Sequence, residues 1–307
     1  MKILVTGGAG FIASHITDKL VEMGHKVVVI DDLSTGKKEN LNSKAKFYEA
    51  DICDAEISEI FKKNKPEIVF HFAAQIDVRK SIQDPASDAK INILGGINVL
   101  ENCKKFKIKK IIFASSGGAI YGEALSIPTT EGYNALPFSP YGIDKLTIEK
   151  YLDYYYKIFN LPFVSLRFAN VYGPRQSCKG EAGAVSIFCN KMARNEYPII
   201  NGNGRQTRDF VFVDDIVNAA ILAMQAKKSD IFNIGTSKET DINTVFRIIK
   251  KEGGFSCKEI HGPAKTGEQK RSCLDYSKAK TQLKWQPKYN LEEGLRLTVN
   301  WFKNNRK

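Results

Sequence analysis

Short apolar runs alternate with longer amphipathic segments over the first half of the chain. The runs that predict buried strands cover residues 2–6, 26–30, 46–50, 67–72, 110–115 and 163–168. Apolar residues at helical spacing predict helices over 11–23, 55–63, 88–105 and 141–159. Apolar strands that alternate with helices are typical of a parallel sheet covered on both faces. We therefore expect an α/β fold with a doubly wound parallel sheet.

The alternation becomes irregular after residue 170. A loop with Gly, Pro and Cys is followed by a predicted helix over 184–193, short strands near 197–201 and 209–213, and a final amphipathic helix from about Leu291. We expect a first domain over 1–170, to which parts of the later chain return. Residues 171–307 are expected to form mainly a smaller mixed α/β lobe, with Trp285 and Trp301 in its core.

The chain of 307 residues is 43% hydrophobic and 26% charged, which excludes collagen-like and disordered classes. Its formal net charge of +12 raises the question of nucleic-acid binding. The lysines are scattered, and no nucleic-acid-binding motif accompanies them, so we expect no nucleic-acid partner. No apolar run nears the roughly 20 residues of a membrane span. The six cysteines lack metal-ligand spacing, which predicts reduced thiols, no metal site and a cytoplasmic protein.

A glycine-rich turn follows the first predicted strand. It reads Thr-Gly-Gly-Ala-Gly from residue 6 and leads directly into the first predicted helix. Gly7 and Gly10 permit a tight turn and close approach to a pyrophosphate, while Phe11 and Ile12 begin a helix whose N–H groups can bind phosphate. Asp31 ends the next strand, at the spacing of roughly 20 to 25 residues expected for a ribose ligand. This context predicts a dinucleotide site.

Two acidic residues favour one dinucleotide over the other. Asp31 and Asp32 can accept hydrogen bonds from ribose hydroxyls but repel a 2′-phosphate, and no arginine is adjacent. We therefore expect NAD rather than NADP. The alternative, that both acids cap the following loop, stays open. Asp51 and Ile52 end the third strand and are expected beside the adenine, although Asp51 could equally cap the next helix.

Tyr141 and Lys145 stand four residues apart in a predicted helix, so both lie on one face. A phenol has a pKa near 10, and a neighbouring ammonium together with a positively charged nicotinamide favours the phenolate. The pair is a candidate general base. Taken alone, the same pattern fits a solvated helix face with an aromatic anchor.

An ordered series of motifs resembles the extended short-chain dehydrogenase/reductase family, specifically its nucleotide-sugar epimerases and dehydratases. The motifs are TGGAGFI at 6–12, DDLSTG at 31–36, HFAAQ at 71–75, SSGGAIYGE at 115–123, SPYGIDK at 139–145, NVYGPRQ at 170–176 and RDFVFVDD at 208–215. The resemblance covers nearly the whole chain. It implies a Rossmann sheet, bound NAD and a UDP-sugar substrate.

The same resemblance implies roles for individual residues. Tyr141 is the expected base and Lys145 its partner, with Ser116 binding the reacting hydroxyl. The family normally has Ser or Thr at the position of Gly117, so Ser115 stays open as an alternative to Ser116. The expected lining of the NAD channel is Phe72, Ala73, Ala74 and Asn92. The expected substrate contacts are Ser116, Asn170, Arg208 and Glu268, and either Lys265 or Arg271 is expected at the diphosphate.

The expected activity is an NAD-dependent UDP-hexose 4-epimerase, an isomerase of galactose metabolism that interconverts UDP-glucose and UDP-galactose. The small Ser272 leaves the N-acetyl forms open. Gly118 and Ala119 provide no acid or base for dehydration. The alternatives are a UDP-glucuronate 4-epimerase or decarboxylase and, from another class, an NAD-sensing binding protein. The resemblance also implies a homodimer through the helices predicted over 88–105 and 141–159.

Overall fold

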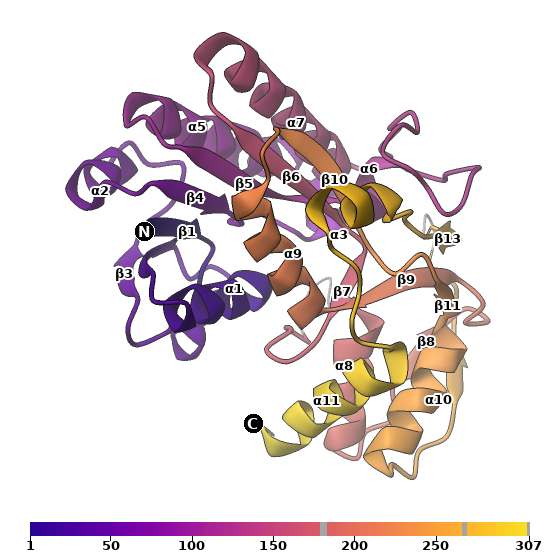
Figure 1. Ribbon diagram of the computed structural model, residues 1–307. Helices are drawn as coiled ribbons and strands as arrows, with labels where there is room; N and C mark the ends of the chain where they lie inside the picture. Colours follow the sequence, from indigo (N-terminus) through magenta and orange to yellow (C-terminus); the bar gives the residue numbers. More distant parts are fainter. Residues whose placement is uncertain (179–182, 266–268, 306–307) are drawn as a thin grey trace.

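The computed structural model describes residues 1–178, 183–265 and 269–305 (Figure 1). Its strands are β1 (Lys2–Thr6), β2 (Lys26–Asp31), β3 (Lys46–Glu49), β4 (Ile68–His71), β5 (Lys110–Ser116), β6 (Phe163–Phe168), β7 (Asn170–Tyr172), β8 (Ile199–Asn201), β9 (Thr207–Phe212), β10 (Asp230–Ile234), β11 (Glu239–Asp241), β12 (Ile260–Gly262) and β13 (Arg271–Ser272).

The α-helices are α1 (Phe11–Glu22), α2 (Ile57–Asn64), α3 (Val78–Gln83), α4 (Pro85–Ala89), α5 (Gly95–Lys105), α6 (Gly117–Ile120), α7 (Pro140–Phe159), α8 (Ala184–Ala193), α9 (Val213–Gln225), α10 (Ile242–Gly253) and α11 (Leu291–Asn304). Short helical turns of other types are η1 (Lys38–Asn40), η2 (Lys90–Leu94) and η3 (Ala279–Leu283).

Within the described residues, a seven-stranded sheet has the order β10-β6-β5-β4-β1-β2-β3, and every neighbouring pair is parallel. The predicted doubly wound parallel sheet is therefore confirmed. The strand order reverses at β1, which lies between β2 and β4. In open α/β sheets such a switch point leaves a crevice at the carboxyl ends of the strands, where ligands bind.

Side chains of β1 alternate between two cores, because successive residues of a strand point to opposite faces. Ile3 and Val5 pack with α1 and α9 on one face, and Leu4 packs with α2, α5 and α7 on the other. All three residues are buried, and Figure 1 shows the helices on either side of the sheet. The two cores hold the carboxyl edge of the sheet rigid, and this edge carries the predicted site.

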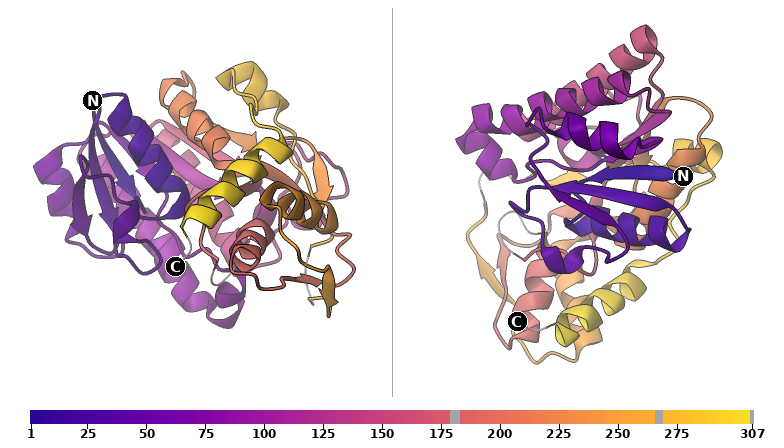
Figure 2. Two further views of the ribbon diagram at one scale, coloured as in Figure 1. Left: turned by 90° about the horizontal axis from the view of Figure 1, so that it is seen from below. Right: turned by 90° about the vertical axis from the view of Figure 1, so that its left-hand side faces the viewer.

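Helix α9 and strand β10 return to the seven-stranded sheet. Most of the other elements after residue 170 form a second lobe beside the sheet (Figure 2). Its core strand β9 pairs with β7, β11 and β13, and helices α8, α10 and α11 share a buried cluster that includes Phe188 and Phe246. Trp301 packs against this cluster as expected. The expectation for Trp285 was wrong: it packs with α9 on the sheet side, where its indole N–H donates to the carbonyl oxygen of Asp215 at 2.9 Å.

Local structure departs from the predicted helix over 88–105. Helical structure begins earlier, at Pro85, because the Asp84 side chain caps α4 by accepting from the N–H of Ser87 at 3.0 Å. The π-type turn η2 then precedes α5. Among the described helices, none combines the length and apolar character needed to cross a membrane. All six cysteines are free thiols.

Candidate active site

The turn after β1 is packed too tightly for side chains. Gly7 has a φ of +73°, and a Cβ there would lie 2.7 Å from the backbone nitrogen of Ala73. A Cβ on Gly10 would lie 3.0 Å from the carbonyl oxygen of Gly7. Gly10 also provides no capping side chain for α1, so the N–H groups at Phe11 and Ile12 open a helix end suited to a phosphate. The cradle fits a dinucleotide pyrophosphate.

Asp31 lies at the end of β2 and faces this turn. Its side chain is 7% exposed; Oδ2 accepts from the N–H of Ala9 and Oδ1 from the N–H of Leu33, both at 2.9 Å. Burial raises the pKa of its carboxyl group, and the two backbone hydrogen bonds oppose that shift. Asp32 is exposed and binds the N–H and hydroxyl of Ser34 instead. The structure thus places Asp31, rather than Asp32, toward the glycine-rich turn.

Other predicted cofactor residues lie at the same edge of the sheet. Phe72, Ala73 and Ala74 directly follow β4 and are partly buried. Asn92 clamps this loop, because its Oδ1 accepts from the N–H of Gln75 at 2.9 Å and its Nδ2 donates to the carbonyl oxygen of Gln75 at 3.0 Å.

The predicted adenine contacts come from the segment after β3. Asp51 accepts from the N–H of Cys53 at 2.8 Å, which makes it a turn former. Ile52 is buried, and a Cβ on Gly95 would lie 2.9 Å from its Cδ1. The segment is thereby fixed against the start of α5.

Helix α7 carries the predicted base and its partner one turn apart. Ser139 caps the helix by accepting from the N–H of Gly142 at 3.2 Å. The Lys145 Nζ lies 5.7 Å from the centre of the Tyr141 ring and donates to the carbonyl oxygen of Ala114, in β5, at 2.9 Å. The hydroxyl of Ser116 forms a side-chain hydrogen bond with Tyr141. The three predicted catalytic side chains therefore meet at the carboxyl end of β5.

Burial acts on both members of the Tyr141–Lys145 pair. It raises the pKa of Tyr141 to about 12, while the hydrogen bond from Ser116 acts in the opposite direction. It lowers the pKa of Lys145 to about 8, although the charges of Asp88, Asp144 and Glu149 partly offset this shift. The phenol is protonated at neutral pH in the chain alone. A cationic ring bound beside it would favour the phenolate.

The structure separates the two candidate serines. Ser115 is 3% exposed and donates to Glu149 Oε1 at 2.7 Å, so its hydroxyl lies in the core, whereas Ser116 bonds to Tyr141. Gly117 has a steric reason to be glycine. A Cβ there would collide with the side chain of Leu274, which is 1% exposed. A serine or threonine at 117 would force the side chain of Leu274 to shift.

A buried polar network behind the site was not predicted. Arg167 donates through Nη2 to Glu149 Oε2 at 2.6 Å, and through Nη1 to the hydroxyl of Tyr121 at 2.7 Å. Tyr121 in turn donates to Asn233 Oδ1 at 2.8 Å. The network connects α7 to β6, β10 and the segment after β5. In the sequence, the network was indicated by Glu149, which lies one turn beyond Lys145 on a largely apolar face of the helix.

The predicted substrate residues come from the second lobe. Asn170 and Arg208 lie on the paired strands β7 and β9, and a Cβ on Gly118 would lie 4.0 Å from Asn170 Oδ1. Arg208 is half-buried and donates to the carbonyl oxygen of Thr207 at 2.8 Å. The adjacent Asp209 is fully buried and accepts from the hydroxyl of Thr236 at 2.6 Å, which fixes this part of β9.

Three further residues were predicted to contact the nucleotide part of the substrate. Glu268 lies outside the described residues, and Lys265 is exposed. Arg271 donates through Nε to Glu239 at 2.9 Å in a two-bond ion pair, so its guanidinium is already engaged.

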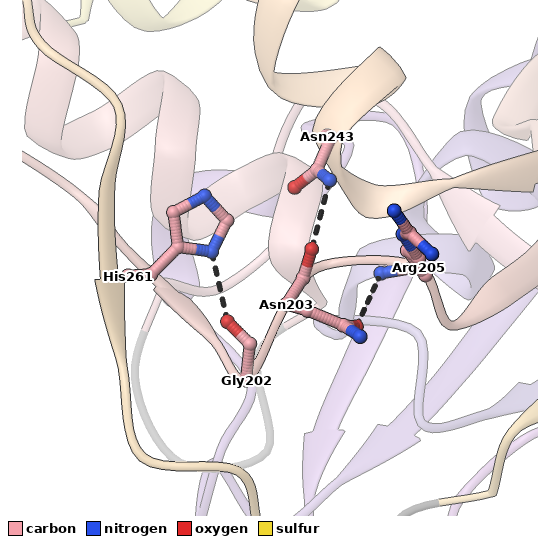
Figure 3. Close-up of a pocket in the computed structure, with 5 residues that line it drawn as sticks. All are labelled: Gly202, Asn203, Arg205, Asn243 and His261. Carbon is pink, nitrogen blue, oxygen red and sulfur yellow. Dashed lines mark hydrogen bonds between the residues drawn. The ribbon is translucent and has the colours of Figure 1, made fainter.

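An open pocket of about 730 Å³ lies in the second lobe near the start of α10. Figure 3 shows its lining: Gly202, Asn203, Arg205, Asn243 and His261. Here His261 Nδ1 lies 2.8 Å from the carbonyl oxygen of Gly202, and Asn243 donates to the carbonyl oxygen of Asn203 at 2.9 Å. These lining residues are not those predicted for the site.

The glycine-rich turn lies at the switch point of a parallel sheet, and a tyrosine and a lysine lie one helical turn apart at the carboxyl end of β5. This combination defines a class of nicotinamide-dinucleotide enzymes. The chain belongs to the NAD dependent epimerase/dehydratase family, whose model matches residues 3–235.

Individual relatives are similar over their full length. A protein of Methanocaldococcus jannaschii described as a putative UDP-glucose 4-epimerase is 49% identical over 303 residues, 99% of each chain. The UDP-glucose 4-epimerase of Thermotoga maritima, solved with UDP-glucose, has a TM-score of 0.98 at 49% identity and 100% coverage of both chains. The UDP-N-acetylglucosamine 4-epimerase of Methanobrevibacter ruminantium, solved with UDP-N-acetylmuramic acid, has a TM-score of 0.94 at 36% identity, covering 99% of this chain and 98% of that one.

Proposed function

We propose that this protein is a UDP-hexose 4-epimerase that interconverts UDP-glucose and UDP-galactose. The observation that carries the proposal is the meeting of Ser116, Tyr141 and Lys145 at the carboxyl end of β5, on the sheet edge that also carries the dinucleotide turn. The similarity to UDP-glucose 4-epimerases over the whole chain supports the same activity. Binding alone needs no base, so the pair also argues against a purely NAD-sensing role.

In this proposal the first domain holds NAD through its own residues. Gly7 and Gly10 admit the pyrophosphate to the end of α1, and Asp31 accepts hydrogen bonds from the adenosine ribose. Asp51, Ile52, Phe72, Ala73 and Ala74 line the channel, which Asn92 holds in shape through Gln75. When bound, NAD accepts a hydride from C4 of the sugar and later returns it, so the reaction consumes no cofactor.

The side chains of α7 and β5 handle the proton. The phenolate of Tyr141 takes the proton of the sugar 4-hydroxyl and gives it back after the keto sugar has turned over. Lys145 lowers the energy of the phenolate and is held in place by its bond to Ala114. Ser116 binds the same hydroxyl and orients it toward Tyr141.

The second lobe holds the nucleotide part of the substrate. We assign Arg208 to the diphosphate, because a guanidinium forms charge-assisted hydrogen bonds with phosphate oxygens. Asn170 lies on the neighbouring strand and faces Gly118, at the border between the lobes. Glu268 is assigned to the uridine ribose from the sequence motif alone.

We also propose that N-acetylated sugars are accepted. Ser272 is a small, buried residue at the position where, by the family resemblance, a bulky residue narrows the sugar pocket. The similarity to a UDP-N-acetylglucosamine 4-epimerase supports this extension.

The test is to incubate the protein separately with UDP-glucose, UDP-N-acetylglucosamine and UDP-glucuronate and to identify each product. Epimerisation of the first two is expected, and Ser272→Tyr should suppress only the acetylated substrate. Turnover of UDP-glucuronate alone would instead support a uronate epimerase or decarboxylase. Absence of turnover with every sugar would support the binding-protein alternative.

The proposed assembly is a homodimer through α5 and α7. On α7, Ile143, Tyr154 and Ile158 share one face at helical spacing and are 50%, 47% and 60% exposed. An apolar helix face of this kind is typical of an interface. By contrast, Leu152 and Tyr155 are buried in the core. Analytical ultracentrifugation should show a dimer that Ile158→Glu converts to a monomer.

The free thiols of all six cysteines support a cytoplasmic location.

A further inference from the structure

Two carboxyl groups from different helices lie against each other behind Lys145. Asp88 belongs to α4 and is 1% exposed, and Asp144 belongs to α7 and is 3% exposed. Helix α4 packs against α7, and Asp88 lies near enough to act on the carboxyl group of Asp144. Two ionised carboxylates are both acceptors, so a hydrogen bond between them requires that one of them carries a proton.

The surroundings of the pair indicate which group is ionised. Asp88 Oδ1 accepts from Gln75 Nε2 at 2.7 Å and from Asn92 Nδ2 at 3.1 Å, as a carboxylate does. Among the described residues, Oδ2 of Asp88 and Oδ2 of Asp144 are buried without a conventional donor. A buried acceptor without a partner is costly. A proton held between the two carboxyl groups, carried mainly by Asp144, converts one acceptor into a donor.

The charges that surround the pair favour the same state. Asp88, on α4, raises the pKa of Asp144, whereas Lys145 and the Asn92 amide lower it. The charges of Asp88, Asp144 and Glu149 raise the pKa of Lys145. Burial and the charge of Lys145 together keep His71, on β4, neutral. Glu149 is already matched by Arg167.

This leaves the Lys145 ammonium facing two acidic side chains. With one shared proton, these two side chains carry one negative charge against one positive charge. Without that proton, the excess negative charge would oppose ionisation of Tyr141, on which the charge of Asp88 also acts.

We propose that Asp88 and Asp144 share one proton at neutral pH and thereby set the charge beside the Tyr141–Lys145 pair, with Asp144 as a positioning residue. Burial, followed by the hydrogen bond to Asp88 and repulsion from it, raises the pKa of Asp144 to about 7, so the proton leaves within the working pH range. The proposed shared proton is argued from the two buried, unpartnered carboxylate oxygens and does not depend on the activity. Its effect on rate rests on the proposed function.

The first test measures the proton directly by infrared spectroscopy of the full chain without substrate. Below pH about 7 the wild type should show a protonated-carboxyl stretch that Asp144→Asn lacks and that fades as the pH rises through this value. Asp153→Asn, on the exposed side of the same helix, should retain the band. Equal spectra for wild type and Asp144→Asn would overturn the proposal. Because no turnover is needed, that result would be independent of the epimerase assignment.

The second test compares the pH dependence of kcat for wild type and Asp144→Asn. At low pH both proteins carry one negative charge on the pair, so the acid limbs should coincide. At high pH only the wild type gains a second charge, so the alkaline limb of the variant should fall at a pH lower by about one unit, because Lys145 loses a stabilising anion. Movement of both limbs would show two permanently ionised carboxylates. Loss of rate without movement of either limb would show a packing role. Either result overturns the proposal.

Discussion

Arg167 of β6 and Glu149 of α7 form a two-bond ion pair against the parallel sheet. Arg167 is 5% exposed and Glu149 is 2% exposed. The Arg167 Nε donates to Glu149 Oε1 at 3.0 Å, and Nη2 donates to Oε2 at 2.6 Å. Glu149 also accepts from Ser115 and Ser165. The pair therefore fixes α7 to β5 and β6 one turn beyond Lys145, and the position of the proposed catalytic helix depends on it.

Replacing Glu149 with Gln should lower the free energy of unfolding by about 3–5 kcal/mol, because it leaves the Arg167 guanidinium buried without its counter-charge. Chemical denaturation of the purified variant measures this loss. The matched control is Asp153→Asn, which removes an exposed carboxylate from a surface pair with Lys157 on the same helix. That change should cost less than about 1 kcal/mol. Equal losses in the two variants would show that the buried pair is not a structural anchor.

Gly117 and Gly118 are adjacent, but only the first should resist a side chain. Gly117→Ala should cost about 1–3 kcal/mol, since its Cβ would overlap Leu274. Gly118→Ala has only Asn170 Oδ1 nearby, at 4.0 Å, and should change stability by less than about 1 kcal/mol. Thermal unfolding compares the two. In a Leu274→Ala background the cost of Gly117→Ala should largely disappear; a cost that persists there would rule out the steric explanation.

Tyr141→Phe should reduce kcat for epimerisation by about 10²–10⁴-fold, because the group that carries the proton is removed. The amount of NAD released on denaturation of the purified variant should stay at the wild-type level. Tyr156→Phe, on an exposed part of the same helix, is the control and should keep its activity. If Tyr141→Phe were as active as the wild type, Tyr141 would not be the base.

His71 should make the fold sensitive to acid. His71 is 2% exposed, its Nδ1 lies 2.9 Å from the Thr6 hydroxyl oxygen, and burial lowers its pKa from 6.5 to about 3. Between these two values the unfolded chain binds more protons, so the free energy of unfolding should fall as the pH falls below 6.5.

Denaturation at a series of pH values should show a shallower acid loss for His71→Asn than for wild type. The exposed His261 has a raised pKa, from its bonds to Gly202 and Glu259, so its contribution has the opposite sign: it is present at low pH and lost as the pH rises. His261→Asn is therefore the control, because its effect on the acid loss should have the opposite sign. An unchanged acid slope in His71→Asn would contradict the assignment.

The doubly wound sheet could be predicted because its signal is local. Apolar strands such as Lys2–Thr6 alternate with amphipathic helices, and the strand ends and glycine turns are adjacent in the chain. The placement of Tyr141 beside Lys145 was predictable for the same reason, since one helical turn sets their relation. Ser116 required the structure, because the choice between it and Ser115 depends on where β5 lies against Glu149.

Long-range contacts account for what could not be predicted. Leu274 meets Gly117 across more than half of the chain, and no local pattern indicates that contact. Trp285 lies on the sheet side, where its indole reaches Asp215 of α9, a helix that has returned to the parallel sheet. The pairing of Asp88 with Asp144 depends on how α4 packs against α7 and on the preceding loop. These relationships come from tertiary packing rather than from periodicity.

The most direct test of the proposed activity uses UDP-galactose carrying deuterium at C4, incubated with the purified protein and no added NAD. The account predicts that UDP-glucose forms and keeps the deuterium at C4, because the hydride leaves and returns through cofactor that stays bound. Conversion with loss of the deuterium to solvent, or conversion only while added NAD is consumed, would contradict it.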